Sequence, residues 1–337
     1  MKTEKKIKMN IKIIKILISI GLIILVFLNF GRLNHSIKPK DAQSEIIKAQ
    51  AVEPGHNPLR SNQQNTQPDK KEKVDTNHQI DRPMISGPVI KVPWINDAEF
   101  ILAQDQNDTP ILMAAYCAVL KDPLPGEEYN VHLAARMLAG KVIRPGDIFS
   151  QNQQIGPYTA EKGFQKGPTY IGSQLATTIG GGVCKIASTL YNVVILSDLQ
   201  VIQRSNHSMP VPYVPYGQDA TVSYGSRDLQ FKNNKTHSVM IWAKGVENQL
   251  YIGFYGAEKP PRIEWHHETI QTTKAPIIEK IVPGLAPGTS KTILEGMDGA
   301  IIKSWLTIEQ QDGKIIIKNL GLSHYRPLPF LIEKSEH

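Results

Sequence analysis

The sequence predicts an α+β protein built in series, with a transmembrane helix, a disordered linker, a mixed α+β domain carrying a cysteine at a helix N-terminus, and a small C-terminal β domain. Three observations predict this. An uncharged apolar run occupies residues 16–30, a polar segment poor in aromatic residues follows it, and strand and helix patterns mix from about residue 88 onward. We expect a basic cytoplasmic leader at 1–10, the anchor at 11–31, the linker at 32–87, the α+β domain at 88–258 and the β domain at 262–337.

The composition excludes several classes of protein. With 41% apolar and 20% charged residues, the chain is neither collagen-like, nor a coiled coil, nor wholly disordered. Six lysines against one glutamate give the first fifteen residues a charge of +5, so the rest of the chain carries only +2 of the total +7. The basic character therefore belongs to the leader, and we expect no nucleic-acid partner.

The apolar run is long enough for a membrane anchor. It reaches back to residue 11 if Lys12 and Lys15 extend their ammonium groups to the interface, which gives about 20 residues for a bilayer core of roughly 30 Å. Lysines precede it, so the positive-inside rule places residue 1 in the cytoplasm. A cleaved signal peptide is the alternative, but no small-x-small cleavage site follows the run. We expect a single-pass protein of the cell membrane whose C-terminal bulk is extracytoplasmic.

The linker and the α+β domain differ in composition and in the pattern of their apolar residues. Residues 32–87 are too polar to offset the entropy of ordering. Beyond them, apolar periodicity and turn residues predict several elements. These are strands at 111–120, 201–204, 220–224 and 229–232, helices at 129–138 and 183–199, and a hairpin of 238–243 with 249–255 that turns at 245–248. A turn at 144–147 leads into residues 148–150, and the glycine-rich stretch at 156–182 is expected to be mostly loop.

The helix at 183–199 has the clearest apolar face. Ala187 and Leu190 can face a core, whereas Ser188 and Asn192 fall near the polar side. After Pro260-Pro261, residues 262–337 alternate apolar and polar positions between glycine turns, which predicts an antiparallel β unit.

Cys184 is the strongest candidate for chemistry. Three glycines, Gly180, Gly181 and Gly182, precede it at a helix start. Glycines permit positive φ and close approach of a ligand, and a helix N-terminus favours a thiolate and can hold an oxyanion. Lys185 adds a nearby cation. A buried structural cysteine is the alternative reading. The other cysteine, Cys117, lies in an apolar run and reads as a small core residue, so a disulfide between the two is the less favoured alternative.

A cysteine nucleophile needs a base, and His207 is the first choice. It lies in a polar turn after a predicted strand, 23 residues beyond Cys184, where a returning strand can bring it back to the helix start. His132 falls within an apolar helix and His237 in a loop. A carboxylate would orient the imidazole, and spacing leaves Asp219 first and Asp228 second. The chain shows no dinucleotide or metal motif, and we expect neither cofactor nor metal.

Several short motifs follow one another along the α+β domain. They are Arg144-Pro-Gly-Asp-Ile-Phe-Ser150, Ile155-Gly-Pro-Tyr158, Gly180-Gly-Gly-Val-Cys184, Ser188-Thr-Leu-Tyr-Asn192, Tyr213-Val-Pro215, Asp219-Ala-Thr-Val222 and Phe231-Lys-Asn-Asn234, together with Arg204 before His207-Ser208. Through these motifs, residues from about 111 to 257 resemble the VanW family. We group Arg204 with the glycines and Lys185 as an oxyanion or substrate loop. The family usually has Gln after its cysteine, where this chain has Lys185.

This resemblance implies a function. It implies an L,D-transpeptidase, with the cysteine as nucleophile, that cross-links peptidoglycan stem peptides, and a link to vancomycin resistance. The alternatives are a non-catalytic wall-binding or glycopeptide-resistance module, and a cysteine peptidase or carboxypeptidase on the same substrate. The tail resembles the five-glycine domain of extracellular wall proteins through Leu285-Ala-Pro-Gly-Thr289, Glu295-Gly-Met-Asp-Gly299 and Asp312-Gly-Lys314.

Overall fold

The computed structural model describes residues 83–121, 123, 125–171 and 174–336. The predicted leader, the predicted anchor at 11–31 and most of the predicted linker lie outside these residues. Within the described part of the chain, no helix is both long and apolar enough to cross a membrane. The described residues belong to one compact unit, 75–337.

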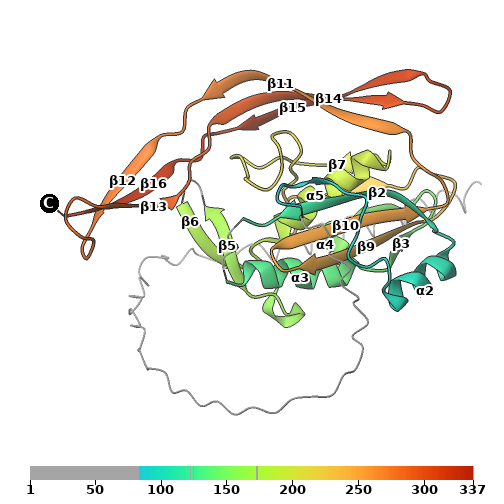
Figure 1. The fold of residues 1–337 in the computed structure, drawn as a ribbon, viewed down its shortest axis with the longest axis horizontal. Helices are drawn as coiled ribbons and strands as arrows, with labels where there is room; N and C mark the ends of the chain where they lie inside the picture. Colours follow the sequence, from blue (N-terminus) through green and yellow to red (C-terminus); the bar gives the residue numbers. More distant parts are fainter. Residues whose placement is uncertain (1–82, 122, 124, 172–173, 337) are drawn as a thin grey trace, which may run out of the picture. The chain divides into compact units, whose positions relative to one another are not determined.

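A five-stranded antiparallel sheet lies at the centre of the fold (Figure 1). Its strands are, in spatial order, β1 (Gly87–Pro88), β2 (Ile111–Val119), β10 (Gln249–Gly256), β9 (Val239–Val246) and β3 (Lys141–Ile143). β9 and β10 form the predicted hairpin. Its turn is shorter than expected, because β9 continues to Val246 and Glu247 takes a φ of 50°.

Both faces of this sheet are buried, and the two-residue period of the strands separates them. In β2, Tyr116 and Ala118 pack into the core formed with the helices α3 (Glu127–Leu138) and α5 (Val183–Leu196). Cys117, which lies between these two residues in the strand, points to the other face and packs in the cluster that includes Phe100 of α2 (Ala98–Asn107). The sheet therefore separates the core around α5 from a second, aromatic cluster.

Smaller elements complete the part of the chain before residue 258. Strands β4, β8 and β7 form a three-stranded sheet, and β5 pairs with β6 as a hairpin. Their bounds are β4 (Ile148–Ser150), α4 (Gln151–Gln154), the 3-10 helix η1 (Ala160–Lys162), β5 (Lys166–Ile171), β6 (Gln174–Ile179), β7 (Gln200–Gln203) and β8 (Gln230–Lys232).

The tail consists of two three-stranded sheets (Figure 1). One has the order β11-β14-β15 and is antiparallel throughout. In the other, β16 pairs antiparallel with β13 but parallel with β12, so the expectation of a wholly antiparallel unit was wrong at that pair. The bounds are β11 (Arg262–Thr273), β12 (Ile277–Val282), β13 (Ser290–Leu294), β14 (Gly299–Glu309), β15 (Ile315–Tyr325) and β16 (Phe330–Ser335).

The tail packs on the same core as α5. Leu306 and Ile308 of β14 are buried in the cluster that contains the α5 side chains. Trp265 of β11 contacts Tyr191 of α5 edge to face, with ring centroids 5.8 Å apart. The division of the chain at residues 258–262 stays a prediction, but the two sides share apolar contacts that the sequence pattern did not indicate.

Two other expectations were wrong, and one helix was missed. Residues 220–224 form no strand beyond a single bridge from Ser223 to Arg227, because their backbone lies against α5 instead. The stretch 156–182, expected to be mostly loop, contains the β5–β6 hairpin. The helix α2 was missed because only Phe100 in it is buried, so it shows no apolar period.

Candidate active site

The glycine-rich turn before α5 is shaped by close backbone packing. Gly182 caps the helix with a φ of +104°, and Gly180 has a φ of +79°. Both values favour glycine. A Cβ on Gly181 would lie 2.2 Å from the carbonyl carbon of Gly167 in β5. The three glycines therefore let the β5–β6 hairpin lie close against the start of α5, just before Cys184.

Asn130 of α3 holds this glycine turn in place through side-chain hydrogen bonds. Its side chain is fully buried. Its Nδ2 donates to the carbonyls of Gly181 (2.9 Å) and Gln165 (2.8 Å), and its Oδ1 accepts from the Gln165 N–H (2.8 Å). Sequence reasoning missed this residue, because an asparagine in an amphipathic helix reads as a surface residue.

Cys184 is the second residue of α5 and is partly exposed. Its Sγ lies 3.5 Å from Thr221 Oγ1 and 3.5 Å from both the N and the O of Val222. It is not disulfide-bonded. Thr221 and Val222 were predicted as part of a strand, and they instead form the wall against which the thiol rests.

The polar side chains of α5 hold that wall in place. Ser188 Oγ accepts from the Ala220 N–H (2.9 Å) and donates to its carbonyl (3.0 Å), and Asn192 donates to the Gln218 carbonyl (2.9 Å). Both side chains are fully buried. The expectation that they lie on a polar outer side was wrong, because they bind loop backbone rather than water.

His207 and Asp219 lie together beside this wall. Asp219 Oδ2 accepts from His207 Nδ1 at 2.6 Å and also from the His207 backbone N–H at 2.6 Å. The carboxylate is 1% exposed and the imidazole 19%. The other ring nitrogen, Nε2, lies 3.5 Å from the Tyr213 hydroxyl, and the ring is close enough to Cys184 for each group to shift the pKa of the other. The structure thus brings together Cys184, His207 and Asp219 in the order that a thiol, a base and an orienting carboxylate require.

The three groups shift one another's pKa values. Burial alone would raise the pKa of the Cys184 thiol, but the hydrogen bond and charge of His207 lower it below its ordinary value. Burial would lower the pKa of His207, but its contacts with Asp219 and Cys184 raise it to about 9. Burial would raise the pKa of Asp219, and His207 and Arg204 hold it below its usual range. Both shifts therefore favour the thiolate–imidazolium pair over the neutral pair.

Two backbone amides at the helix start are available to a ligand. The amides of Gly180, Gly181, Val183 and Lys185 donate to backbone carbonyls. Among the described residues, we find no acceptor for the N–H groups of Gly182 and Cys184. Unpaired N–H groups at a helix N-terminus attract negative charge, so these two amides are the candidate oxyanion donors.

Lys185 is engaged in contacts with other side chains of the domain. Its Nζ forms an ion pair with Glu127 of α3 and lies 5.0 Å from the ring centroid of Tyr213. Burial lowers the pKa of the Lys185 ammonium, and the Glu127 carboxylate favours its charged form. The Lys185 ammonium, which the sequence suggested as a cation beside Cys184, is thus already paired with Glu127.

Arg204 lies behind Asp219 rather than beside the glycine turn. Its Nε donates to the Asp219 carbonyl (2.7 Å), and one terminal nitrogen donates to Asp219 Oδ1 (3.0 Å) and to the Gly217 carbonyl (3.2 Å). The guanidinium also lies over the ring of Tyr191, 5.1 Å from its centroid. These contacts connect it to the carboxylate and its loop, not to the oxyanion or substrate loop with which the sequence grouped it.

The alternative candidates lie elsewhere. Asp228 accepts from Ser150 Oγ (2.5 Å) and the Asn152 N–H (3.0 Å), and so caps α4 rather than contacting His207. Cys117 is fully buried, and burial raises the pKa of its thiol to about 12. His132 bonds the Glu247 carbonyl, far from the cysteine in the fold.

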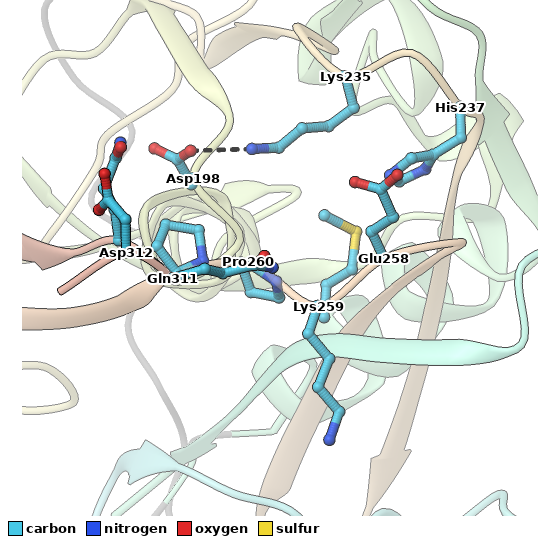
Figure 2. Close-up of a pocket in the computed structure, with 11 residues that line it drawn as sticks. Asp198, Lys235, His237, Glu258, Lys259, Pro260, Gln311 and Asp312 are labelled. Atoms are coloured by element: carbon cyan, nitrogen blue, oxygen red, sulfur yellow. Dashed lines mark hydrogen bonds and ion pairs between the residues drawn. The ribbon is translucent and has the colours of Figure 1, made fainter. Parts of the chain in front are cut away.

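A cavity of about 370 Å³ lies near the other end of α5 (Figure 2). The ion pair of Asp198 with Lys235 borders it, together with His237 and Glu258. Asp198 follows the C-terminus of α5, which is about 21 Å long, so this cavity is separate from Cys184. Across the described residues, no three His, Cys, Asp or Glu side chains gather as metal ligands would.

Comparison with known proteins identifies the domain. Residues 126–255 match the family model described as VanW like protein. The chain is 34% identical over 146 residues to the uncharacterized protein YoaR of Bacillus subtilis, covering 43% of this chain and 48% of that protein. It is 32% identical over 139 residues to the vancomycin B-type resistance protein VanW of Enterococcus faecalis, covering 40% of this chain and 50% of that protein.

Two solved structures are also similar in part. The HP0197-G5 crystal structure is 15% identical in sequence with a TM-score of 0.13, and the match covers 22% of this chain and 97% of the HP0197-G5 chain. The IgA1 protease G5 domain is 22% identical with a TM-score of 0.15, and covers 24% of this chain and 98% of its own.

Fold and site together define a mixed α+β domain with a Cys–His–Asp cluster at the start of a buried helix. Residues 126–255 form a VanW-like domain, similar in sequence to part of two curated proteins. The chain spans about half the length of the curated relatives that it matches.

Proposed function

We propose that the protein is a cysteine acyl transferase of the cell wall, an L,D-transpeptidase that links the third residues of peptidoglycan stem peptides. The observation that carries this proposal is the connected set of Cys184, His207 and Asp219, with Asp219 Oδ2 2.6 Å from His207 Nδ1 and a lowered pKa at the thiol. The substrate class comes from the family resemblance. One relative is named a vancomycin resistance protein.

The geometry supports a two-step mechanism. The Cys184 thiolate attacks the carbonyl carbon of the third residue of a donor stem, and the N–H groups of Gly182 and Cys184 stabilise the oxyanion. As the C–N bond breaks, the His207 imidazolium gives its proton to the leaving terminal D-alanine. An acceptor amine then attacks the thioester and loses a proton to His207, and the C–S bond breaks to restore the thiolate. Asp219 holds the imidazole in place throughout.

Hydrolysis uses the same residues. If water rather than an amine reaches the thioester, the protein is a carboxypeptidase or peptidase on the same stem. A non-catalytic wall-binding module is the alternative from a different class. The proposed location, anchored by residues 11–31 with the bulk outside the cytoplasm, would put Cys184 on the same side of the membrane as the wall.

The decisive experiment incubates the full-length protein with defined muropeptides and identifies the products by mass spectrometry. Dimers linked between third residues support the transpeptidase, whereas shortened monomers support hydrolysis. Cys184→Ala should abolish either product. Cys117→Ala is the matched control, because it removes the other thiol from a different part of the core. Products that persist in Cys184→Ala would exclude the thiol mechanism.

A further inference from the structure

We propose that Tyr325, at the end of β15 in the tail, is a positioning residue for Asp219, so that the C-terminal strands form part of the catalytic unit. The inference rests on the proposed function of Cys184, His207 and Asp219 and adds a residue that the sequence placed in a separate domain. It is carried by hydrogen bonds that reach Asp219 from a residue 106 positions away in the sequence.

The two carboxylate oxygens of Asp219 have different partners. Oδ2 accepts twice from His207, as described above. Oδ1 accepts from the Tyr325 hydroxyl at 2.5 Å and from Arg204 at 3.0 Å. Because all four bonds are in place on a side chain that is 1% exposed, the carboxylate is held in one orientation, with Oδ2 toward the imidazole.

The same phenol also fixes the backbone that carries Asp219. Its oxygen accepts from the Gly217 N–H at 2.8 Å. Gly217 has a φ of +85°, and a Cβ there would lie 2.5 Å from Ser304 Oγ of β14. Residues 217–219 are thus seated directly on the tail. Tyr325 is itself buried, and burial together with the Asp219 charge raises its pKa far above the physiological range, so it remains a neutral donor.

Further bonds connect the tail to the segment around His207. Arg204 donates to Ser323 Oγ at 2.9 Å, and the Arg326 N–H donates to the Ser208 carbonyl at 2.8 Å. Asn206 donates to the His324 carbonyl at 2.9 Å. The end of β15 therefore contacts both the loop that carries the imidazole and the loop that carries its carboxylate.

This arrangement has a chemical consequence. Without the phenol, Oδ1 of Asp219 loses a donor, so the carboxylate is held less firmly in the orientation that directs Oδ2 at the imidazole. The bond that supports the imidazolium is then formed less well. A weaker imidazolium supports the thiolate less, so the effect of a change at Tyr325 should appear at Cys184, which no described contact joins directly to Tyr325.

The test is the pH dependence of Cys184 alkylation by iodoacetamide, measured in full-length Cys117→Ala protein so that one thiol reports. Tyr325→Phe should raise the pKa of Cys184 and slow alkylation at pH 7 by roughly 3- to 10-fold. In an Asp219→Asn background, Tyr325→Phe should add little further change, because it acts through the carboxylate. Additive effects would overturn the proposal.

Tyr216→Phe is the matched control. Tyr216 also connects the two sides, since its hydroxyl donates to the Asp298 carbonyl at 2.6 Å and its ring stacks edge to face on Tyr325, but no described bond joins it to Asp219. It should leave the alkylation profile unchanged. If Tyr325→Phe does not fold, Ser323→Ala removes an acceptor from Arg204 and should shift the profile in the same direction, and an unchanged profile would overturn the proposal.

The outcomes also separate this inference from the proposed function. A Cys184 thiol with an ordinary pKa in the otherwise unaltered protein would count against the catalytic role itself. A lowered pKa that Tyr325→Phe does not change would leave the catalytic role standing and exclude the positioning role.

Discussion

Asp219 Oδ2 accepts two hydrogen bonds from the same residue, His207, whose backbone N–H and ring Nδ1 each lie 2.6 Å away. One carboxylate oxygen therefore fixes both the course of the chain at His207 and the direction of its ring. With Nδ1 engaged, Nε2 is the ring nitrogen left to exchange a proton, and it lies 3.5 Å from the Tyr213 hydroxyl.

The two cysteines should respond oppositely to truncation. Cys184→Ala should abolish dimer formation yet change the melting temperature by no more than about one degree, since a partly exposed thiol contributes little packing. Cys117→Ala should retain the chemistry and lose about 1 kcal/mol or more, because it leaves a gap in a packed cluster. Chemical denaturation and muropeptide assays check both. A reversal of the two phenotypes would return Cys184 to a structural role.

Substitutions at the two candidate carboxylates, Asp219 and Asp228, should have different effects. Asp219→Asn should slow acylation and raise the pH at which Cys184 alkylates, because the amide supports an imidazolium poorly. Asp228→Asn should lower stability by about 1 kcal/mol through its bonds to Ser150 and the Asn152 N–H, and leave the alkylation profile unchanged. Thermal unfolding and alkylation rates across pH distinguish them. A larger effect on alkylation at Asp228 would reassign the orienting role.

The pH profiles of two reactions should diverge. Because the pKa of Cys184 lies below its ordinary value, alkylation should already be fast near neutral pH. The pKa of His207 is raised to about 9, so the ring is protonated below that pH and loses its proton above it. Acyl transfer should therefore fall above about pH 9, where the leaving amine lacks a proton donor, while alkylation stays fast. Parallel decline of both would mean that unfolding, not His207, sets the limit.

Removal of the tail should affect the core. Deleting residues 262–337 takes away Tyr325 and the apolar contacts of Leu306 and Trp265 with the core around Tyr191. We expect a lower melting temperature and loss of activity on soluble muropeptides. A truncated protein that melts and reacts like the full chain would establish an independent wall-binding tail.

The anchor is testable in cells. If residues 11–31 are retained, the protein should fractionate with membranes at full length, and external protease should cut near residues 60–75. N-terminal sequencing of the mature protein checks this. A first residue between about 31 and 45 would indicate a secreted form.

The local pattern of apolar and turn residues was sufficient to predict the elements with strong periodicity. The strand at β2, the helices α3 and α5 and the β9–β10 hairpin follow from apolar period and turn residues. Pattern failed at residues 220–222, where apolar alternation resembles a strand. Their backbone groups bond instead to Ser188 of α5 and Cys184 Sγ, contacts that depend on tertiary packing.

The site shows the same limit. A cysteine after three glycines and a histidine in a polar turn are local signals, and both were found from the sequence. The choice between Asp219 and Asp228 was not, because it depends on which carboxylate meets the ring. Asn130 and Tyr325 gave no local signal, since their partners lie 35 or more residues away.

The alternation of β2 has a consequence for redox behaviour. Cys117 lies on the face of the central sheet opposite to the one that α5 covers, so a sheet of backbone stands between the two sulfurs. A disulfide needs its two Cβ atoms to point toward each other, and the Cys117 side chain points to the opposite face of the sheet. Oxidation of Cys184 must therefore proceed through a thiol or peroxide from outside the chain, and a reductant of low molecular weight should be able to reverse a mixed disulfide without unfolding the protein.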